Sequence, residues 1–520
     1  MKRSLPYLVA VLLTCVVRGR VEDSFRVRPY LQHPTQDAIT ICWFSNTAEP
    51  GTVTVEQSGG SIEFQSTPQQ VKTLAYNPFG EEPGGPHPTP PYRHRIRVTG
   101  LKPHTQYRYT VRQGTAKQAD VFRTAPDADT PIRFILYADS ETEPESSTSS
   151  PVDWPPAKGS NRPEGIKQYL VDQTTGYREN LKVIDSRKPN FISVVGDLVE
   201  SGGEQRDWDE FWKHNAGEYD SLAGHIPLVA ALGNHENYGG PGTFGGYSAA
   251  AADFGCEKFR TYFEFPSNNA ADPYHESRYY RFDYGPITLI AVDSSDGLPA
   301  NTAADTNHYL TGSHVPGFHP GSPQYVWLER QLADAQKQSR FTFVQYHHTA
   351  YGSGPHSVPF GQPGFSGQSG IAMRVLQPLF LKYGVDAVFS GHDEMLERSL
   401  IQGKETLSDG TTRPHEIHYY DVGIGGDGLR GPSTDFDNPH RKFLAHDDAP
   451  EVWSGRQLVS GGKHYGHLEV NVGPDTQGQW QVNLVPVQVF PVTNSGGEVV
   501  GWERRTYDDS VTISSSSRSR

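Results

Sequence analysis

The clearest pattern along the chain is a short apolar run that ends in a polar residue able to bind a metal. Phe191–Val195 (FISVV) leads directly into Gly196 and Asp197. Such a run predicts a buried strand that carries a carboxylate at its carboxyl end. The design recurs at four other places: 131–137 before Asp139, 227–232 before Asn234, His235 and Glu236, 341–345 before His347, and 385–389 before His392 and Glu394. Because ligand sites of open α/β sheets lie beyond the carboxyl ends of the strands, we expect these side chains to converge.

Helical periodicity lies between these strands. Pro323–Gln338 has apolar residues at helical spacing and a proline at its start, which predicts an amphipathic helix. Residues 205–219 and 371–383 have similar spacing, and we interpret the aromatic side chains of 205–219 as core. Strands that alternate with helices predict a layered α/β domain, which we place at 130–492. A polar tail is expected at 493–520.

Residues 24–126 have a different pattern. Aromatic and β-branched residues gather in short stretches between turn residues, at 38–44, 51–56, Tyr92–Val98 and 106–112. This spacing predicts a small all-β sandwich. The turn that begins at Gly100 and precedes Tyr107 resembles the pattern of fibronectin type III domains.

Composition and charge narrow the function. The chain has 520 residues, 35% of them hydrophobic, and a formal net charge of -14. That length can bury the cores of more than one domain. Proteins that bind nucleic acids usually present a basic face, so we expect no such surface here. A negatively charged chain repels an anionic substrate unless bound cations reverse the charge locally. The composition therefore favours a metal site if the substrate is an anion. The oligomeric state is left open.

The amino terminus predicts export. Lys2 and Arg3 precede an apolar run at 5–17, which is too short for a membrane span and typical of a signal peptide, here placed at 1–20. Secretion or a periplasmic location follows, and a lipid anchor at Cys15 is the alternative. No later stretch of the sequence is long and apolar enough to cross a bilayer. Cys42 and Cys256 either pair or, as we favour, remain separate thiols in different domains.

Taken in chain order, the residues at the strand ends resemble a known family. The five motif blocks of the calcineurin-like metallophosphoesterases are similar to Asp139, Gly196-Asp197, Gly233-Asn234-His235-Glu236, Val344-x-x-His347 and Gly391-His392-x-Glu394. The closer resemblance is to the purple acid phosphatase branch, in which a fibronectin-like domain precedes the catalytic one. It implies a metallophosphatase sandwich of two mixed sheets flanked by helices, preceded by the small β-sandwich.

The resemblance also implies two divalent or trivalent metal ions bridged by Asp197. One ion would be held by Asn234, His347 and His392. The other would take Asp139 and two further ligands, and here the sequence departs from the family.

The departures are three carboxylates. Glu141 stands where many members have a histidine, Glu394 replaces the last histidine of the fifth block, and Glu200 stands where the purple enzymes have a tyrosine. With Glu141 and Glu394 as ligands, the site that contains Asp139 is rich in carboxylates and favours calcium, manganese or magnesium. The site of Asn234, His347 and His392 suits zinc, iron or manganese. The alternative is that Glu394 marks a site that has lost one metal.

The activity that the resemblance implies is hydrolysis of small phosphate monoesters by a hydroxide that bridges the metals. His235 would stabilise the transition state or protonate the leaving oxygen, and Glu236 would orient it. A phosphodiesterase on nucleotides or lipid head groups is the second possibility, and a binding protein with a degenerate site is the third.

Some residues outside the motifs carry secondary predictions. The insertion at 141–163 is either a lid or disordered, and the glycine-rich stretch 423–428 is interpreted as a turn. Tyr351 and His356 are candidates for substrate contact, whereas His348 is interpreted as a packed histidine and Arg398 as structural.

Overall fold

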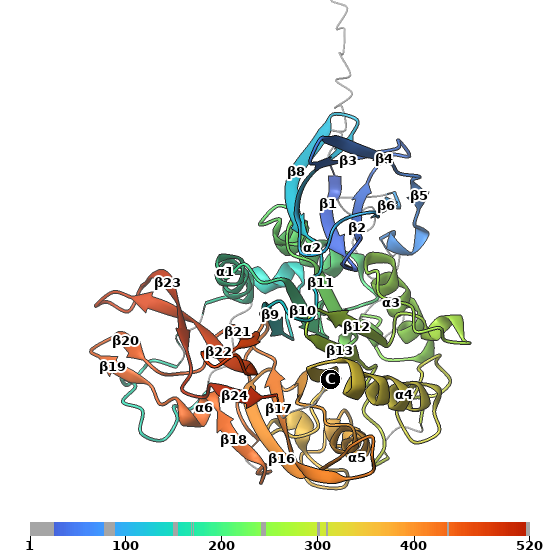
Figure 1. Cartoon of the computed structure of the whole chain (residues 1–520). Coiled ribbons are helices and arrows are strands. Elements are labelled where there is room, and N and C mark those ends of the chain that lie inside the picture. The colour runs from blue at the N-terminus through green and yellow to red at the C-terminus, as the bar shows by residue number, and fades with distance from the viewer. Residues whose placement is uncertain are drawn as a thin grey trace, which may run out of the picture.

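The computed structural model describes residues 25–76, 89–148, 154–167, 169, 171–240, 246–298, 302–307, 310–433 and 436–515. The predicted signal peptide and Cys15 lie outside these residues. No helix in the described ranges is long and apolar enough to cross a membrane. The described chain forms an all-β domain that sits on a larger layered domain (Figure 1).

The amino-terminal domain packs two four-stranded antiparallel sheets face to face. One has the order β1-β2-β6-β5 (Phe25–Gln32, Ile39–Ser45, Tyr92–Val98 and Gln69–Gln70) and the other β4-β3-β7-β8 (Gly60–Gln65, Thr52–Gln57, Gln106–Gln113 and Ala116–Arg123). Alternating inward residues such as Val53, Val55 and Val111 fill the core between the sheets. The backbone N–H of Lys102 donates to Tyr107 Oη at 2.9 Å, which ties the predicted turn to its strand.

The larger domain is built on two mixed sheets, each with seven strands among the described residues. The first has the order β11-β10-β9-β21-β22-β23, with β24 also on β22 (Leu228–Ala231, Phe191–Val195, Ile132–Tyr137, Gly466–Pro474, Trp480–Thr493, Val499–Thr506 and Val511–Ser514). The second has the order β12-β13-β14-β15-β17-β16-β18 (Tyr280–Tyr284, Ile287–Ala291, Phe341–His348, Ala387–Gly391, Thr412–Val422, Leu396–Thr406 and Arg441–Leu444). Phe134 and Phe343 meet between the sheets with ring centroids 5.8 Å apart.

Helices cover the outer face of each sheet. The first sheet is covered by α1, α2 and α3 (Gln173–Ser186, Gln205–Ala216 and Ala249–Tyr262), and the second by α4 and α5 (Pro323–Gln338 and Gln377–Lys382). A short α6 (Ala445–Asp448) precedes the ribbon of β19 and β20 (Val452–Ser454 and Gln457–Ser460). The predicted helix at 371–383 is instead the 3-10 helix η7 (Gly370–Leu376) followed by α5, since Pro378 starts a new helical segment.

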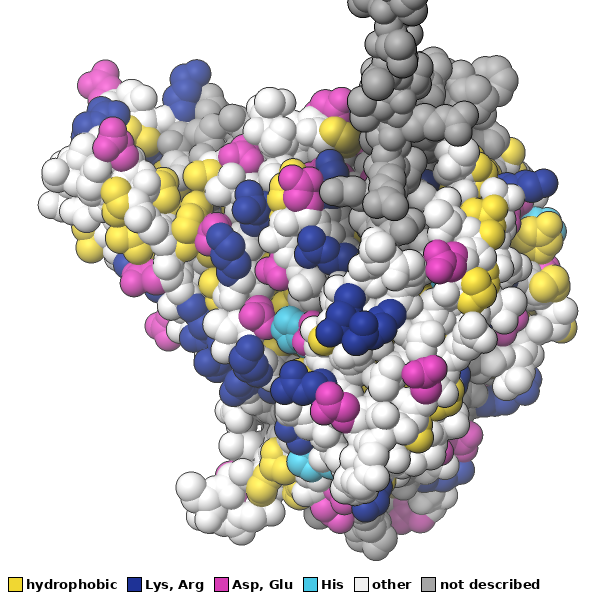
Figure 2. All heavy atoms as spheres, turned by 90° about the horizontal axis from the view of Figure 1, so that it is seen from above, with side chains coloured by type: hydrophobic (Ala, Val, Ile, Leu, Met, Phe, Trp, Pro, Cys, Tyr) yellow, Lys and Arg dark blue, Asp and Glu magenta, His cyan; other side chains and the backbone are white. Residues whose placement is uncertain are grey.

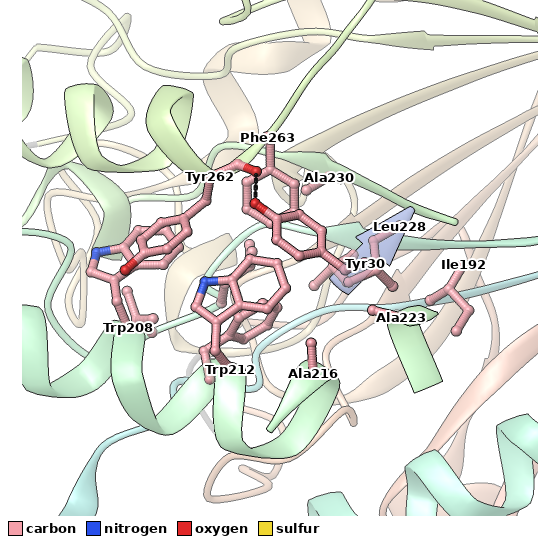
Figure 3. Close-up of a cluster of buried hydrophobic side chains, with 14 of the residues drawn as sticks. Tyr30, Ile192, Trp208, Trp212, Ala216, Ala223, Leu228, Ala230, Tyr262 and Phe263 are labelled. Carbon is pink, nitrogen blue, oxygen red and sulfur yellow. Dashed lines mark hydrogen bonds between the residues drawn. The ribbon is translucent and has the colours of Figure 1, made fainter. Parts of the chain in front are cut away.

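The aromatic side chains of α2 are core, as predicted. Figure 3 shows Trp208 and Trp212 packed beside Tyr30 of the amino-terminal domain and Tyr262 of α3. Tyr30 Oη donates to the Tyr262 carbonyl at 2.6 Å. Burial of several large rings at one junction fixes the two domains against each other, because each buried ring contributes roughly 1.5–3 kcal/mol.

The predictions for the two cysteines, the polar tail and Arg398 have different outcomes. Cys42 and Cys256 are both free and buried, so the favoured interpretation as separate thiols is confirmed. The polar tail is wrong for most of its length, because β23 and β24 both pair with β22. β23 carries charged residues and is exposed or half-buried along its length, and β24 is only four residues long, so neither gives a clear strand pattern in the sequence. Arg398, predicted to be structural, pairs with Asp509 between Oδ1 and Nη2 at 2.5 Å.

Candidate metal centre

The predicted strand ends converge at one edge of the two sheets. His347 at the end of β14 places its Nε2 2.8 Å from Asp197 Oδ2 and 3.8 Å from Asp139 Oδ1. The backbone N–H of His392, just after β15, donates to both carboxylate oxygens of Asp139 at 3.0 Å. Parallel pairing of β9 with β10 and of β14 with β15 brings these ends together, as the apolar runs predict.

Backbone strain is concentrated at this edge. Among the described residues, eleven that are not glycine have positive φ. Five of them are predicted ligands: Asp139, Glu141, Asp197, His392 and Glu394. Each such residue costs of order 1–3 kcal/mol, so the surrounding fold must hold them in place. Strain gathered on one set of side chains indicates a functional arrangement.

Two motif glycines make room for the carboxylates. A Cβ at Gly233 would lie 2.0 Å from Asp197 Oδ1, and one at Gly391 would lie 2.4 Å from Asp139 Oδ2. Both distances are far inside van der Waals contact. The glycines of the third and fifth blocks are therefore required by the packing of Asp197 and Asp139.

Each of the two imidazoles of this site has one ring nitrogen bound to a backbone carbonyl. His347 Nδ1 donates to the Val195 carbonyl at 3.0 Å, and His392 Nε2 donates to the Gln368 carbonyl at 2.7 Å. In the neutral rings, His347 Nε2 and His392 Nδ1 are then acceptors. His347 and His392 form a group with Asp197 in which one possible ligand atom of each residue lies within 4.8 Å of the others. Buried acceptors that face one another with no hydrogen between them suit a cation.

Asn234 adds a fourth donor to this half. Its Nδ2 donates to Tyr247 Oη at 2.9 Å, and its buried Oδ1 has no hydrogen-bond partner among the described residues. A buried amide oxygen without a partner is costly unless a ligand satisfies it. We call Asp197, Asn234, His347 and His392 the histidine half of the centre.

A second group consists of carboxylates alone. Glu141, Glu394 and Asp427 place oxygens within 4.8 Å of one another. Burial raises the pKa of Glu141 and of Glu394 well above the ordinary value, and the charge of Asp427 raises both further. Such mutual repulsion is relieved by a hard cation with oxygen ligands. We call these three residues the carboxylate half.

Asp427 is a residue that the sequence interpretation misses. The stretch 423–428, interpreted as a plain turn, carries it into the carboxylate half, where Gln173 Nε2 donates to its Oδ1. The backbone N–H groups of Gly426 and Asp427 donate to the Asp139 carbonyl at 3.0 and 2.9 Å, which folds the turn over the site. The sequence could have indicated Asp427, because this residue follows the apolar end of strand β17 just as the other ligand residues follow their strands.

Arg430 follows this turn and spans the two halves. Its Nη2 lies 2.6 Å from Glu394 Oε1, and its Nη1 donates to His356 Nε2 at 2.9 Å. The His356 ring lies against His392, with centroids 4.1 Å apart. His356 therefore lies beside the site, where its contact with substrate stays a prediction, and Arg430 is a second residue that the sequence interpretation misses.

His235 lies at the opening of the centre. Its Nδ1 donates to the Glu200 carbonyl at 2.6 Å, and its Nε2 lies 3.9 Å from Glu141 Oε2. Burial lowers the pKa of His235, but the charges of Asp197 and Glu200 outweigh this and raise the pKa to about 9. A fifth of the side chain is exposed, so a protonated ring faces both the cluster and solvent.

Glu236 does not orient His235, contrary to the sequence interpretation. Its buried carboxylate accepts hydrogen bonds from the backbone N–H groups of Asp197, Leu198 and Gly233, at 3.0, 2.8 and 2.7 Å. These contacts join the turn after β10 to the turn after β11. Glu236 therefore fixes the backbone beneath the histidine half and touches no reacting group.

His348 and Tyr351 lie in different surroundings. His348, interpreted as a packed histidine, is fully buried with its Nδ1 2.7 Å from Ser294 Oγ. A register shift between Gln345 and His348 also brings the centroid of its ring within 4.4 Å of that of His392. Tyr351 lies in the core, with its ring 4.8 Å from that of Tyr419 and its hydroxyl on Gln377. Tyr351 is therefore a packing residue.

The described part of the insertion is ordered by contacts with the carboxyl-terminal strands. Arg162 forms two hydrogen bonds with the Glu451 carboxylate at 2.8 and 2.5 Å. Asn161 exchanges hydrogen bonds with the backbone of Trp453 at 2.9 and 2.7 Å. These contacts hold 154–167 in a defined position against Glu451 and Trp453, so this segment is an ordered loop.

The two mixed sheets and their metal-ligand edge define a metallophosphoesterase domain. The family model for calcineurin-like phosphoesterases matches residues 171–393, and that for the amino-terminal domain of purple acid phosphatases matches residues 25–125. These matches identify a calcineurin-like phosphoesterase domain at 171–393, preceded at 25–125 by a domain of the kind found at the amino terminus of purple acid phosphatases. The family predicted from the five blocks is confirmed.

Individual relatives are distant. An uncharacterized protein of Mycobacterium tuberculosis (strain H37Rv) is 28% identical over 310 residues, which cover 58% of this chain and 50% of that protein. The "Purple acid phosphatase" of Glycine max is 23% identical and covers 82% of this chain and 80% of its own. The "Probable inactive purple acid phosphatase 27" of Arabidopsis thaliana is 27% identical, over 46% of this chain and 34% of its own. The chain thus spans about half the length of the first curated relatives, or less.

Solved structures confirm the predicted fold class. Purple acid phosphatase PPD1 from yellow lupin (Lupinus luteus) seeds has a TM-score of 0.60 at 20% identity and covers 95% of this chain and 74% of its own. PhoD has a TM-score of 0.56 at 14% identity, with 94% and 90% covered. At these identities the likeness concerns the fold.

Proposed function

We propose that this chain is an exported, metal-dependent phosphoric ester hydrolase that acts on small phosphate monoesters. The observation that carries the proposal is the meeting of five strand ends, which gathers the histidine half, the carboxylate half and Asp139 beneath His235. The family and the purple acid phosphatase relatives support hydrolysis of phosphate esters.

The donors fit two cations of different chemistry. The histidine half would hold zinc, iron or manganese, and the carboxylate half, with Asp139 beside it, would hold calcium, manganese or magnesium. Bound cations would neutralise phosphate oxygens and make a water molecule acidic enough to attack phosphorus near neutral pH. Asp197, which belongs to a group with His347 and to a group with Glu141, would bridge the halves.

The chain's own residues position the rest of the reaction. The Glu200 carbonyl fixes the Nδ1–H of His235, so Nε2 faces the cluster and can hold a proton for the leaving oxygen. Glu236 keeps the two turns in register. The imidazoles of His348 and His356 lie beside His392, and additional imidazoles at such a centre favour monoesters over diesters.

Metal replacement and one histidine variant test the proposal together. The purified protein is stripped of metal, reloaded with calcium, manganese, zinc or iron singly and in pairs, and assayed on an aryl phosphomonoester and the matching diester. We expect hydrolysis with a pair that contains one hard ion. His235→Gln should lower kcat by about 100- to 10,000-fold, the range for loss of a general acid.

His225→Gln is the matched control, since 23% of the His225 side chain is exposed against 20% for His235. It pairs with Asp185, away from the centre, and should leave kcat unchanged. Full activity of His235→Gln would reject His235 as the general acid, whereas no hydrolysis with any pair of ions would reject the enzyme in favour of a binding protein. The names of some relatives include "inactive", which makes this outcome informative.

A further inference from the structure

Three residues of different charge beside the centre are partly exposed to solvent. The side chains of His235, Glu200 and Arg430 are 20%, 37% and 42% exposed, whereas those of Glu141 and Glu394 are nearly closed to solvent at 5% and 3%. A substrate that enters the centre therefore meets Arg430 on the side of the carboxylate half.

The charge of the cluster calls for a further cation. Asp139, Glu141, Asp197, Glu394 and Asp427 supply five carboxylates. Two divalent ions and the protonated His235 supply five positive charges, so a doubly charged phosphoryl group that arrives brings an excess of negative charge. An arginine is always protonated and suits phosphate oxygens, because its planar guanidinium donates in two parallel directions.

Arg430 is held in position to make such a contact. Its N–H groups at Nη1 and Nη2 reach His356 and Glu394, and its backbone N–H donates to the Glu394 carbonyl at 3.0 Å. A guanidinium has five N–H groups, so the exposed part of the side chain can offer others. Because both the guanidinium and the backbone of Arg430 are held by hydrogen bonds, less conformational entropy is lost when the guanidinium binds a phosphate oxygen.

We propose that Arg430 recognises the terminal phosphoryl group and makes the centre selective for monoesters over diesters. A monoester offers three terminal oxygens and up to two negative charges, and a diester offers two oxygens and one charge. Arg430 donates a hydrogen bond to the additional terminal oxygen of the monoester. This inference rests on the proposed function, since it concerns the substrate of the same centre.

The test compares Arg430→Ala and Arg430→Lys with the wild-type protein. For Arg430→Ala we expect kcat/KM for the aryl monoester to fall about 10- to 100-fold, the usual effect of a lost charge-assisted hydrogen bond. The value for the matching diester should change less than about threefold, within the worth of a single weak contact. Arg430→Lys should lie between, because an ammonium keeps the charge without the fork.

Arg187→Ala is the matched control. Arg187 is 32% exposed and pairs at 2.9 Å with Glu469, which is 1% exposed, far from the centre. It should leave the monoester-to-diester ratio unchanged. Metal content is measured on every sample, because loss of a cation in Arg430→Ala would mean that Arg430 acts only through Glu394 and would overturn the proposal.

Calorimetric binding of inorganic phosphate to the metal-loaded proteins separates this proposal from the proposed function. If the wild type binds phosphate but hydrolyses neither ester, the function fails, and weaker binding by Arg430→Ala still supports recognition. If phosphate binds both proteins equally, or binds neither, or if the ester ratio is unchanged, Arg430 does not read the phosphoryl group.

Discussion

The histidine half and the carboxylate half differ in how they are built. The first combines Asp197 with three neutral side chains that are each fixed by a further hydrogen bond, such as that from His347 to Val195 and that from His392 to Gln368. The second consists of carboxylates whose neighbours are a long, half-exposed arginine and a glycine-rich turn. The first half is preformed, whereas the second depends on charge balance. The two halves should therefore respond differently to metal removal and to mutation.

Asp197 connects the halves, so its replacement should have the largest effect. Asp197→Asn removes one negative charge from both ligand groups to which Asp197 belongs. We expect phosphomonoester hydrolysis to fall about 1,000-fold or more, since several kcal/mol of transition-state stabilisation depend on the cations. Elemental analysis should show less metal of both kinds. Activity within tenfold of the wild type would show that the halves work independently.

The two halves were also not equally predictable from the sequence. The histidine half follows from apolar runs with polar ends, because parallel pairing forces those ends to one edge. Asp427 and Arg430 come from a glycine-rich turn, whose path depends on backbone contacts with Asp139 and not on a local pattern. The role of Glu236 depends on three N–H groups that meet only after two strands pair.

A pair of reciprocal variants separates the halves by metal. Glu394→Gln should weaken binding of calcium or manganese by about 10- to 100-fold or more, a range that loss of even an outer contact produces. It should leave zinc or iron in place. His392→Ala should do the reverse, since the ring contributes to the histidine half alone. Metal content after dialysis measures both effects. If both kinds of ion leave together in either variant, the two halves form a single cooperative site.

The smallest effect concerns the framework beneath the histidine half. Glu236→Gln places an amide NH₂ where a carboxylate oxygen accepts backbone hydrogen bonds, and an unsatisfied buried group should lower the free energy of unfolding by about 1–3 kcal/mol. Glu397→Gln is the matched control: Glu397 is 1% exposed against 0% for Glu236, and it accepts from Ser353 and Asn438 and not from the turns after β10 and β11. Both variants should lose stability in thermal melting, but only Glu236→Gln should weaken retention of zinc or iron. Equal retention in the two variants would mean that the histidine half keeps its geometry without Glu236. The preformed character of that half would then reside in the second hydrogen bonds of the imidazoles.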